Sequence, residues 1–281
     1  MISGKTKLYG IFGYPVEHTF SPGMHNAALK KLGMDACYVP FAVKPESLKD
    51  ALKAVLPLGL CGLNITVPHK EQVISFLDEL SEEARLINAV NTIEVRGGGL
   101  IGHNTDGRGF LMSLKVDARF NPKGKKFLII GSGGAARAVG FSLALAGAGR
   151  IVFHDVDSGK ADALVSDIRQ KVGTESESIA KGAFASYALD ADCLINATPL
   201  GLKKTDILPI RKEHILEKHL VYDLVYNPPE TALLKAAKAR GARRFSGLGM
   251  LLYQGVAAFE IWTGKKAPVQ IMKRALLRQM K

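Results

Sequence analysis

Residues 127–137 read FLIIGSGGAAR, and this stretch decides the fold expected for the chain. The run from Phe127 to Ile130 is fully apolar and predicts a buried strand, while the Ala- and Leu-rich sequence up to Ala146 predicts a helix. The glycines between them allow a tight turn and a close approach to a pyrophosphate, whose charge the helix start favours. Because the spacing is GxGGA instead of GxGxxG, the match to the dinucleotide-binding fingerprint is partial, and a glycine turn without a ligand is the alternative.

A second apolar strand is expected downstream at Ile151–Phe153, and Asp155 follows it, 24 residues after Gly131. An acid at this place binds the ribose 2′-hydroxyl in NAD enzymes. A helix cap or a plain surface charge is the alternative role for Asp155. S-adenosylmethionine methyltransferases combine a similar turn with an acid, but nothing else in the chain favours that class.

Short apolar runs alternate with helix-like stretches along the chain, which predicts an α/β fold with parallel βαβ units. The polar stretch Asp117–Lys126 has the composition of a connection between two domains. The apolar face of the expected last helix, Pro268–Met280, must dock on another part of the protein. Further strands are expected at Leu8–Phe12, Ala36–Phe41, Leu60–Thr66, Thr92–Val95, Leu100–Gly102, Cys193–Asn196 and Val221–Leu224.

The composition excludes several classes of protein. The 281 residues carry a net charge of +12, but basic residues occur in scattered pairs and not in the runs typical of nucleic-acid binding, so no nucleic-acid partner is expected. The three cysteines form no CxxC pair, which predicts reduced thiols in a cytoplasmic protein. The longest uncharged stretch, Phe245–Phe259, is too short to span a membrane. No histidine pattern predicts a metal site, and no GxSxG motif is present.

Polar residues cluster at three places in the first 107 residues of the chain. In GLNITVPHK, residues 62–70, Asn64 and Thr66 lie on one face of a strand, and Pro68 ends it so that Lys70 opens the next helix. A lysine at a helix start opposes the macrodipole, and residues placed against local preference are often functional. A solvated lysine is the alternative.

The remaining two clusters also fit ordinary structural roles. In HNTDG, residues 103–107, Asp106 either carries chemistry or caps the following helix. Asn91 is by itself a plain turn residue. Thr19 and Ser21 place two hydroxyls before an expected helix, where serine followed by proline is a common start.

Together these clusters resemble the shikimate dehydrogenase family, including its quinate/shikimate branch. The resemblance implies a substrate domain formed by residues 1–106 and 247–281, and a Rossmann domain over residues 107–246 that binds NADP or NAD. It also implies that the last helices return to the first domain. The markers are GYPVEHTFSPGMHN at 13–26, GLNITVPHK at 62–70, NAVNT at 88–92, HNTDGRG at 103–109, GSGGAARA at 131–138, NATPLGL at 196–202, DLVYNPPET at 223–231 and GLGMLLYQG at 247–255.

The same resemblance implies roles for single residues in the reversible reduction of 3-dehydroshikimate to shikimate. Lys70 and Asp106 match the catalytic pair. The positions that match substrate contacts, or lie beside them, are Thr19, Ser21, Asn64, Thr66, Asn91, Tyr226 and Gln254. The positions that match the pyrophosphate loop are Gly131, Ser132, Gly133, Gly134 and Ala135, and those near the nicotinamide are Leu224 and Gly247.

Two departures from the family pattern bear on function. Thr19 replaces the usual first serine of a Ser-x-Ser pair. Where NADP-using members carry Asn-Arg-Thr, this chain has His154-Asp155-Val156, and a carboxylate repels a 2′-phosphate. We therefore expect NAD, with NADP as the alternative. An NAD-dependent quinate/shikimate dehydrogenase and a relative acting on another acid, such as an aminoshikimate, are the alternative functions. The assembly is expected to be a monomer or a homodimer.

Overall fold

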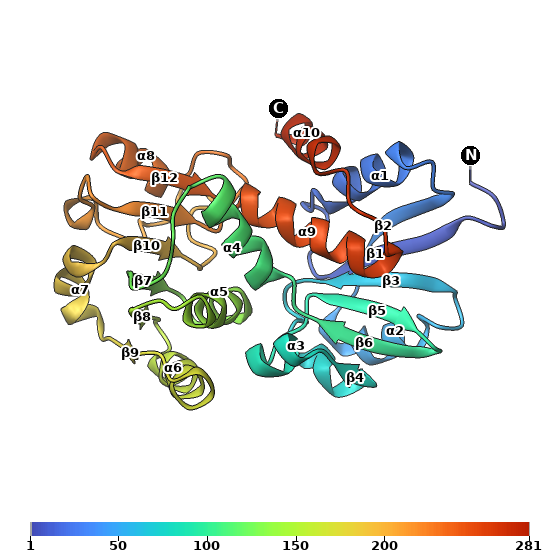
Figure 1. The fold of residues 1–281 in the computed structure, drawn as a ribbon, viewed down its shortest axis with the longest axis horizontal. Helices are drawn as coiled ribbons and strands as arrows, with labels where there is room; N and C mark the ends of the chain where they lie inside the picture. The colour runs from blue at the N-terminus through green and yellow to red at the C-terminus, as the bar shows by residue number, and fades with distance from the viewer. Residues whose placement is uncertain (1, 281) are drawn as a thin grey trace. The chain divides into compact units, whose positions relative to one another are not determined.

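The computed structural model describes residues 2–280, with the side chain of Lys181 outside the description. The chain forms two compact units (Figure 1). Unit 1 contains the residues up to Gly109 and those from Leu252 onward, and unit 2 contains Phe110–Leu251. The chain passes from one unit to the other within helix α4, Asp106–Val116, and within helix α9, Leu248–Thr263.

Unit 1 is built on a mixed sheet whose described strands have the order β2-β1-β3-β5-β6-β4. Strands β1, β2 and β3 are parallel, whereas β5 and β6 form an antiparallel hairpin around the glycine turn at 97–99. The strands are β1 Lys7–Gly13, β2 Ala36–Ala42, β3 Leu60–Ile65, β4 Glu79–Leu80, β5 Thr92–Arg96 and β6 Gly99–His103. The helices are α1 Ser21–Lys31, η1 Pro45–Ser47, α2 Leu48–Lys53, η2 Gln72–Phe76, α3 Glu82–Ile87 and α10 Val269–Gln279, in addition to the ends of α4 and α9.

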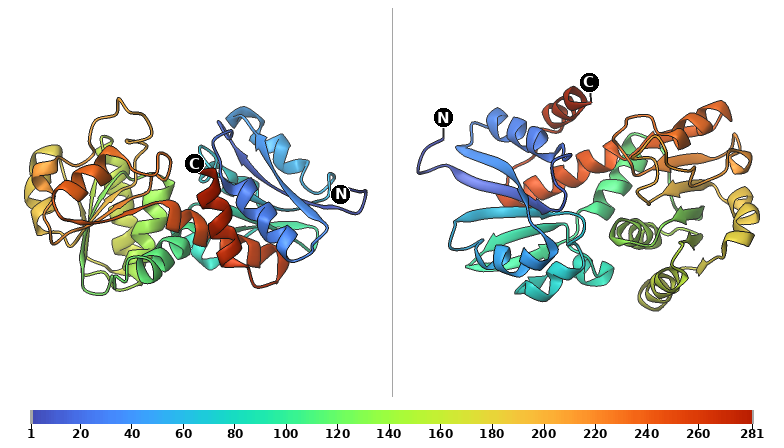
Figure 2. Two further views of the ribbon diagram at one scale, coloured as in Figure 1. Left: turned by 90° about the horizontal axis from the view of Figure 1, so that it is seen from above. Right: turned by 180° about the vertical axis from the view of Figure 1, so that it is seen from behind.

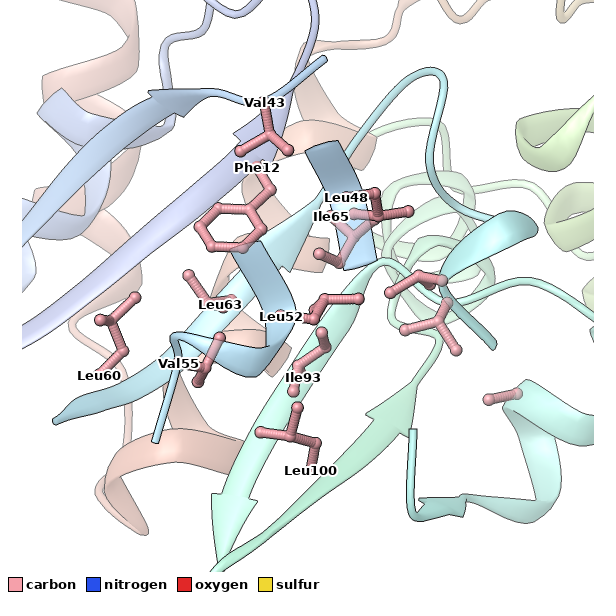
Figure 3. Packing of buried hydrophobic residues seen from close by; sticks show 13 residues of the cluster. Phe12, Val43, Leu48, Leu52, Val55, Leu60, Leu63, Ile65, Ile93 and Leu100 are labelled. Carbon is pink, nitrogen blue, oxygen red and sulfur yellow. The ribbon is translucent and has the colours of Figure 1, made fainter. Parts of the chain in front are cut away.

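The two faces of this sheet are covered differently. On one face, Leu48 and Leu52 of α2 and Val73 of η2 pack with Leu63 and Ile93 of the sheet into an apolar cluster (Figure 3). The other face receives α1 and α9. There the indole of Trp262 lies so close to Gly62 that a Cβ at this glycine would collide with the ring. The predicted polar cluster lies on this second face.

The expected docking of the last helix is also found within unit 1. Helix α10 packs along α1, and the Gln279 side chain donates a hydrogen bond from Nε2 to the carbonyl of Phe20. Met272 and Leu276 of α10 are fully buried, which explains its apolar face.

Unit 2 contains a fully parallel sheet with the described strand order β12-β11-β10-β7-β8-β9. The order reverses at β7, which has β10 on one side and β8 on the other, so its carboxyl end is a topological switch point of a Rossmann-type sheet. The strands are β7 Lys126–Ile130, β8 Arg150–His154, β9 Ser176–Ser178, β10 Cys193–Asn196, β11 Leu220–Asp223 and β12 Arg243–Ser246. The helices are α5 Gly134–Leu145, α6 Ser158–Val172, η3 Lys181–Ala183, α7 Phe184–Asp190, η4 Lys212–His214 and α8 Ala232–Ala239.

Helices cover both faces of this second sheet, as the two views of Figure 2 show. Phe184 of α7 and Leu233 of α8 pack with Leu194 of β10 on one face. On the other face the ring centroids of Phe110 in α4 and Tyr222 lie 4.9 Å apart. Gly140 of α5 allows close packing against Phe153. The predicted α/β fold with two units is thus observed.

Two details of the fold differ from the sequence-based expectation. Lys70 does not open an α-helix: it lies in a turn, and only the short η2 follows from Gln72, so the macrodipole argument for its importance was wrong. Ser21 is the first residue of α1 and not its cap, since Phe20 occupies the N-cap position and no side chain caps the helix.

Three further findings concern the composition-based expectations. Cys37, Cys61 and Cys193 carry free thiols. Within residues 2–280 no helix is long and apolar enough to cross a membrane. Over the same residues, no group of three or more His, Cys, Asp or Glu side chains is arranged to hold a metal ion.

Candidate active site

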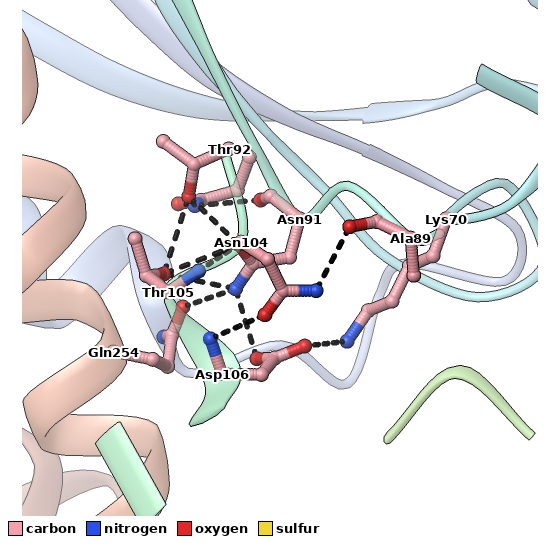
Figure 4. A network of polar contacts seen from close by, with 9 residues as sticks. Lys70, Ala89, Asn91, Thr92, Asn104, Thr105, Asp106 and Gln254 are labelled. Carbon is pink, nitrogen blue, oxygen red and sulfur yellow. Dashed lines mark hydrogen bonds and ion pairs between the residues drawn. The ribbon is translucent and has the colours of Figure 1, made fainter. Parts of the chain in front are cut away.

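A buried lysine–carboxylate pair lies at the centre of unit 1's polar cluster. Lys70 Nζ donates to Asp106 Oδ2 at 2.6 Å, and the two side chains are only 16% and 6% exposed (Figure 4). Removing two charges from water is costly unless they pair and keep further hydrogen bonds. Lys70 and Asp106 form such a pair and are not buried completely, so they are well placed to act on a bound molecule.

Asn91 connects this pair to the surrounding side chains. Its Nδ2 group donates to Asp106 Oδ1 at 2.8 Å, to Thr105 Oγ1 at 2.9 Å and, at a longer 3.4 Å, to Gln254 Oε1 of α9. Its Oδ1 accepts from the backbone N–H of Thr105 at 2.7 Å. Both carboxylate oxygens of Asp106 therefore have fixed partners, and the carboxylate cannot turn away from Lys70 without breaking one of them.

The turn that carries Lys70 is held by backbone contacts. Its carbonyl accepts a hydrogen bond from the N–H of Val90 at 2.8 Å, next to Asn91. The preceding residue, His69, is fully buried, and its Nε2 lies 2.7 Å from the carbonyl oxygen of Val43. Lys70 is thus anchored both by its own backbone and by the residue before it. A rigid support of this kind keeps a reactive group in one geometry.

Asn64 and Thr66 extend the cluster along β3. Asn64 Nδ2 donates to the carbonyl of Asn91 at 3.1 Å and to Thr92 Oγ1 at 3.2 Å. Thr66 follows the end of β3, and its backbone N–H donates to the carbonyl of Phe12. A Cβ at Gly13 would collide with the Thr66 methyl group, so glycine is needed there for the threonine to take this position.

Thr19 and Ser21 lie where the chain enters α1. Thr19 Oγ1 accepts a hydrogen bond from the N–H of Ser21 at 3.3 Å. Ser21 is 3% exposed, and Thr19 is half-buried. The methyl group that distinguishes Thr19 from serine therefore does not prevent the two residues from sharing one turn.

A further carboxylic acid lies near the pair. Burial raises the pKa of Glu83 in α3, while the charge of Arg108 opposes this shift and that of Asp106 adds to it. Glu83 carries no motif in the sequence, and nothing in the primary structure pointed to it. The charge of Asp106 thus acts on Glu83 as well as on Lys70.

Unit 2 contains the second candidate site, at the glycine turn after β7. Gly131 has a φ of +103°, and a Cβ there would meet the carbonyl oxygen of Ala197 at 2.9 Å, so only glycine fits. Gly133 is the N-cap of α5 and supplies no capping side chain, which leaves the first N–H groups of a twelve-residue helix for a ligand. A Cβ at Gly133 would meet nothing within 4 Å, so the approach is open. This arrangement fits a pyrophosphate group.

Asp155 is joined to this turn directly. Its Oδ2 accepts from the N–H and the hydroxyl of Ser132, at 2.7 and 2.6 Å, and its Oδ1 accepts from the N–H of Asp157 at 2.9 Å. These hydrogen bonds lower the pKa of the Asp155 carboxyl although partial burial raises it. The cap of α6 is Asp157, which accepts from the N–H of Lys160, so capping does not explain Asp155.

A cavity of about 620 Å³ opens beside Asp155 within unit 2. Phe184, Leu208 and other apolar groups form much of its wall, and Arg211 and His214 add polar groups to that of Asp155. Arg211 and His214 lie far along the chain and in no motif, and only the fold reveals that they share a cavity with Asp155. Arg137, in contrast, is tied to Asp167 Oδ2 at 2.5 Å and is 9% exposed.

The last predicted positions also lie in unit 2. A Cβ at Gly247 would overlap the carbonyl oxygen of Leu224, so the two segments touch through their backbones and glycine is required. Tyr226 is half-buried, and burial raises the pKa of its hydroxyl.

The structure distributes the predicted site residues over the two units. Lys70, Asp106 and six of the seven substrate positions belong to unit 1, where Asn64, Asn91 and Gln254 share one hydrogen-bond network with the pair. Tyr226 and all predicted cofactor positions belong to unit 2.

Comparison with known proteins gives a consistent result. Residues 11–93 match the family described as shikimate dehydrogenase substrate binding domain, and residues 247–277 match the shikimate 5′-dehydrogenase C-terminal domain. A relative from Desulforamulus reducens, named shikimate dehydrogenase (NADP⁺), is 47% identical over 99% of this chain and 97% of its own length.

Solved structures are similar over the whole length. A crystal structure of shikimate dehydrogenase in complex with NADP⁺ has a TM-score of 0.92 and 42% identity, and covers 100% of this chain and 98% of its own. The shikimate 5-dehydrogenase of Listeria monocytogenes in complex with shikimate and NAD has a TM-score of 0.90 and 36% identity, and covers 97% of each chain.

Proposed function

Because the chain belongs to the shikimate dehydrogenase family, we propose that it catalyses the reversible reduction of 3-dehydroshikimate to shikimate with a nicotinamide cofactor. The observation that carries the proposal is the ion pair of Lys70 and Asp106, joined through Asn91 to Gln254 in one buried network. An NAD-dependent quinate/shikimate dehydrogenase is the second candidate, since Asp155 favours the cofactor of that branch.

The chemistry of the pair follows from the charge that the reaction creates. A bound nicotinamide supplies the hydride for reduction and accepts it in the reverse direction. Hydride addition to a carbonyl carbon leaves negative charge on the oxygen, which the Lys70 ammonium stabilises and to which it can transfer a proton. Asp106, 2.6 Å away, orients the lysine and exchanges protons with it or with the substrate.

The remaining polar groups of unit 1 suit a polyhydroxylated acid. Such a substrate needs many short hydroxyl and amide partners, because each buried polar group left unmatched is costly. We assign the hydroxyls of Thr19 and Ser21 to the substrate carboxylate, and Thr66, Asn91 and Gln254 to the ring hydroxyls. The proposed contacts also include Asn64 and Tyr226.

Unit 2 is proposed as the cofactor domain. The open glycine turn would hold the pyrophosphate, and the positions of Leu224 and Gly247 would lie near the nicotinamide. The cavity beside Asp155 has room for the adenosine portion. The residues present therefore fit a dinucleotide.

We further propose NAD as the preferred dinucleotide. Asp155 carries a lowered pKa and is ionised at neutral pH, so it attracts ribose hydroxyls and repels a 2′-phosphate. The relatives argue in the other direction, because the one described above is named for NADP⁺ and one of the two structures contains it. Arg211 on the same cavity is a group in this chain that would favour a phosphate.

A steady-state assay that crosses shikimate and quinate with NAD and NADP tests these assignments. We expect shikimate to be oxidised with both cofactors and most efficiently with NAD. Absence of shikimate turnover with either cofactor would overturn the proposal. Quinate turnover as efficient as that of shikimate would favour the second candidate.

A further inference from the structure

Tyr38 of β2 has no role in the proposed reaction, yet two residues of α1 contact it. At its backbone, Asn26 Oδ1 accepts from the Tyr38 N–H at 2.9 Å, and Asn26 Nδ2 donates to the Tyr38 carbonyl at 2.8 Å. Because β2 is the edge strand of its sheet, the carboxamide of Asn26 takes the place of a neighbouring strand at this one residue. These two hydrogen bonds fix the position of Tyr38 relative to α1.

The ring of Tyr38 is fixed by aromatic neighbours. His25, the residue before Asn26, stacks on it with ring centroids 4.5 Å apart and an interplanar angle of 13°. Trp262 of α9 lies 6.0 Å from the same ring and is itself held by a hydrogen bond from Nε1 to the carbonyl of Ile93 at 2.9 Å. Tyr38 is 1% exposed, so its ring has one available orientation.

The hydroxyl of Tyr38 contacts one of the proposed substrate positions. It donates to Asn64 Oδ1 at 2.7 Å. Asn64 is then held from both ends, because its Nδ2 group donates to Asn91 and Thr92. A chain of hydrogen bonds runs from the Tyr38 hydroxyl through Asn64, Thr92 and Asn91 to Asp106.

We propose that Tyr38 is a positioning residue for the substrate: its hydroxyl sets the orientation of the Asn64 carboxamide, so that this group meets the acid in the correct geometry. This proposal rests on the proposed function, and it adds a residue that touches neither the substrate nor the cofactor. Without the hydroxyl, Asn64 Oδ1 loses the donor that holds the carboxamide before the acid arrives.

The substitution Tyr38→Phe tests the proposal because it removes one oxygen and leaves the stacked ring. We expect the KM for shikimate to rise about 3- to 10-fold, the range for loss of one hydrogen bond, with kcat within about twofold and the cofactor KM unchanged. The effect should fall below about twofold in an Asn64→Ala background, because the two residues act through one hydrogen bond.

Tyr222→Phe is the matched control. Tyr222 is equally buried and donates to Ser113 Oγ at 2.8 Å, in the interior of unit 2. Both variants should lower the Tm by similar amounts, about 2–4 °C, whereas only Tyr38→Phe should raise the KM for shikimate. An unchanged KM in Tyr38→Phe, or an equal KM increase in both variants, would overturn the inference. Lack of shikimate turnover by the unmodified protein would instead remove the proposed function, and it is measured first.

Discussion

The two candidate sites of this protein are built in different ways. In unit 1 the site consists of side chains that already hydrogen-bond one another, from Lys70 and Asp106 to Asn91 and Gln254. In unit 2 it consists of backbone N–H groups at a glycine turn, one carboxylate and an open cavity.

Under the proposed function, this difference matches what each site would have to distinguish. A small polyhydroxylated acid is identified by many short polar groups in fixed positions, and holding these groups beforehand reduces the entropic cost of binding. A dinucleotide is larger, and its shared portions need only a general phosphate site, so the choice between two cofactors depends on very few residues. We therefore expect substitutions in unit 1 to affect chemistry and substrate affinity, and substitutions near Asp155 to affect cofactor choice.

The largest effect is expected for Lys70→Ala. General acid–base groups contribute roughly 10²–10⁴-fold, so kcat should fall by ~10²-fold or more, while the KM for shikimate changes much less. Steady-state kinetics of the purified, folded variant measure both. Lys53→Ala is the control, since it breaks an exposed ion pair with Asp50 in the same unit and should leave kcat unchanged. A Lys70→Ala variant that keeps more than half of the kcat would contradict the catalytic assignment.

The two sites could not be predicted equally well from the sequence. The glycine turn and the strand before it are contiguous, so the pattern in residues 127–137 was enough to predict their structure. The network of unit 1 joins Asn91 to Gln254, 163 positions apart, and no local pattern reports such a contact. Those residues were identified through the family resemblance, because each of them alone fits an ordinary structural role.

Some strands were not predicted from the sequence because they form only next to a neighbouring strand. Strands β4, β9 and β12 lie at the edges of their sheets and are short and largely polar, so they depend on a neighbouring strand and carry no apolar run. Tyr38 and Arg211 were not selected either, since their importance comes from what the fold places beside them. The expected α-helix at Lys70 was wrong because the chain forms a turn there, held by His69 and Val90.

Unit 1 also contains a buried imidazole, that of His25, and its ring contrasts with the hydrogen-bonded side chains of the candidate site. Neither ring nitrogen of His25 has a hydrogen-bond partner among the described residues, and burial lowers its pKa to about 3. An unfolded histidine takes up its proton near pH 6.5, so acid favours the unfolded state between these two values. His25 therefore does not reduce the free energy of unfolding above pH 6.5. On acidification from pH 7 to pH 5 this free energy should fall by about 2 kcal/mol.

His25→Phe should therefore reduce the acid sensitivity of unit 1. Urea unfolding at pH 7 and pH 5, followed by the fluorescence of the single tryptophan, Trp262, measures it next to the site of the change. The exposed His18 provides the control variant His18→Phe, which should behave like the unmodified protein. Equal losses of stability in all three proteins would show that His25 is not the group responsible.

Cofactor choice tests the unit 2 side of the comparison. Asp155 facing a 2′-phosphate costs about 1–3 kcal/mol, so kcat/KM should favour NAD over NADP by at least about tenfold near neutral pH. The double replacement His154→Asn with Asp155→Arg should move the preference toward NADP by a similar factor. Arg211→Ala changes the other charge on the same cavity and should leave the efficiency with NAD unchanged. Better efficiency with NADP in the unmodified protein, lost in Arg211→Ala, would assign the choice to Arg211 instead.

The smallest effect is expected for Gln254→Ala and Thr66→Ala. These variants test most directly whether the substrate and the cofactor bind to separate units. Each variant loses about one hydrogen bond to the substrate, so the KM for shikimate should rise about fivefold. The Kd for the cofactor, measured by titration without substrate, should not change, because both residues belong to unit 1 and the glycine turn belongs to unit 2. Gln270→Ala removes an exposed glutamine of α10 and should alter neither value. A matched loss of cofactor affinity in folded Gln254→Ala would contradict the assignment of substrate and cofactor to separate units.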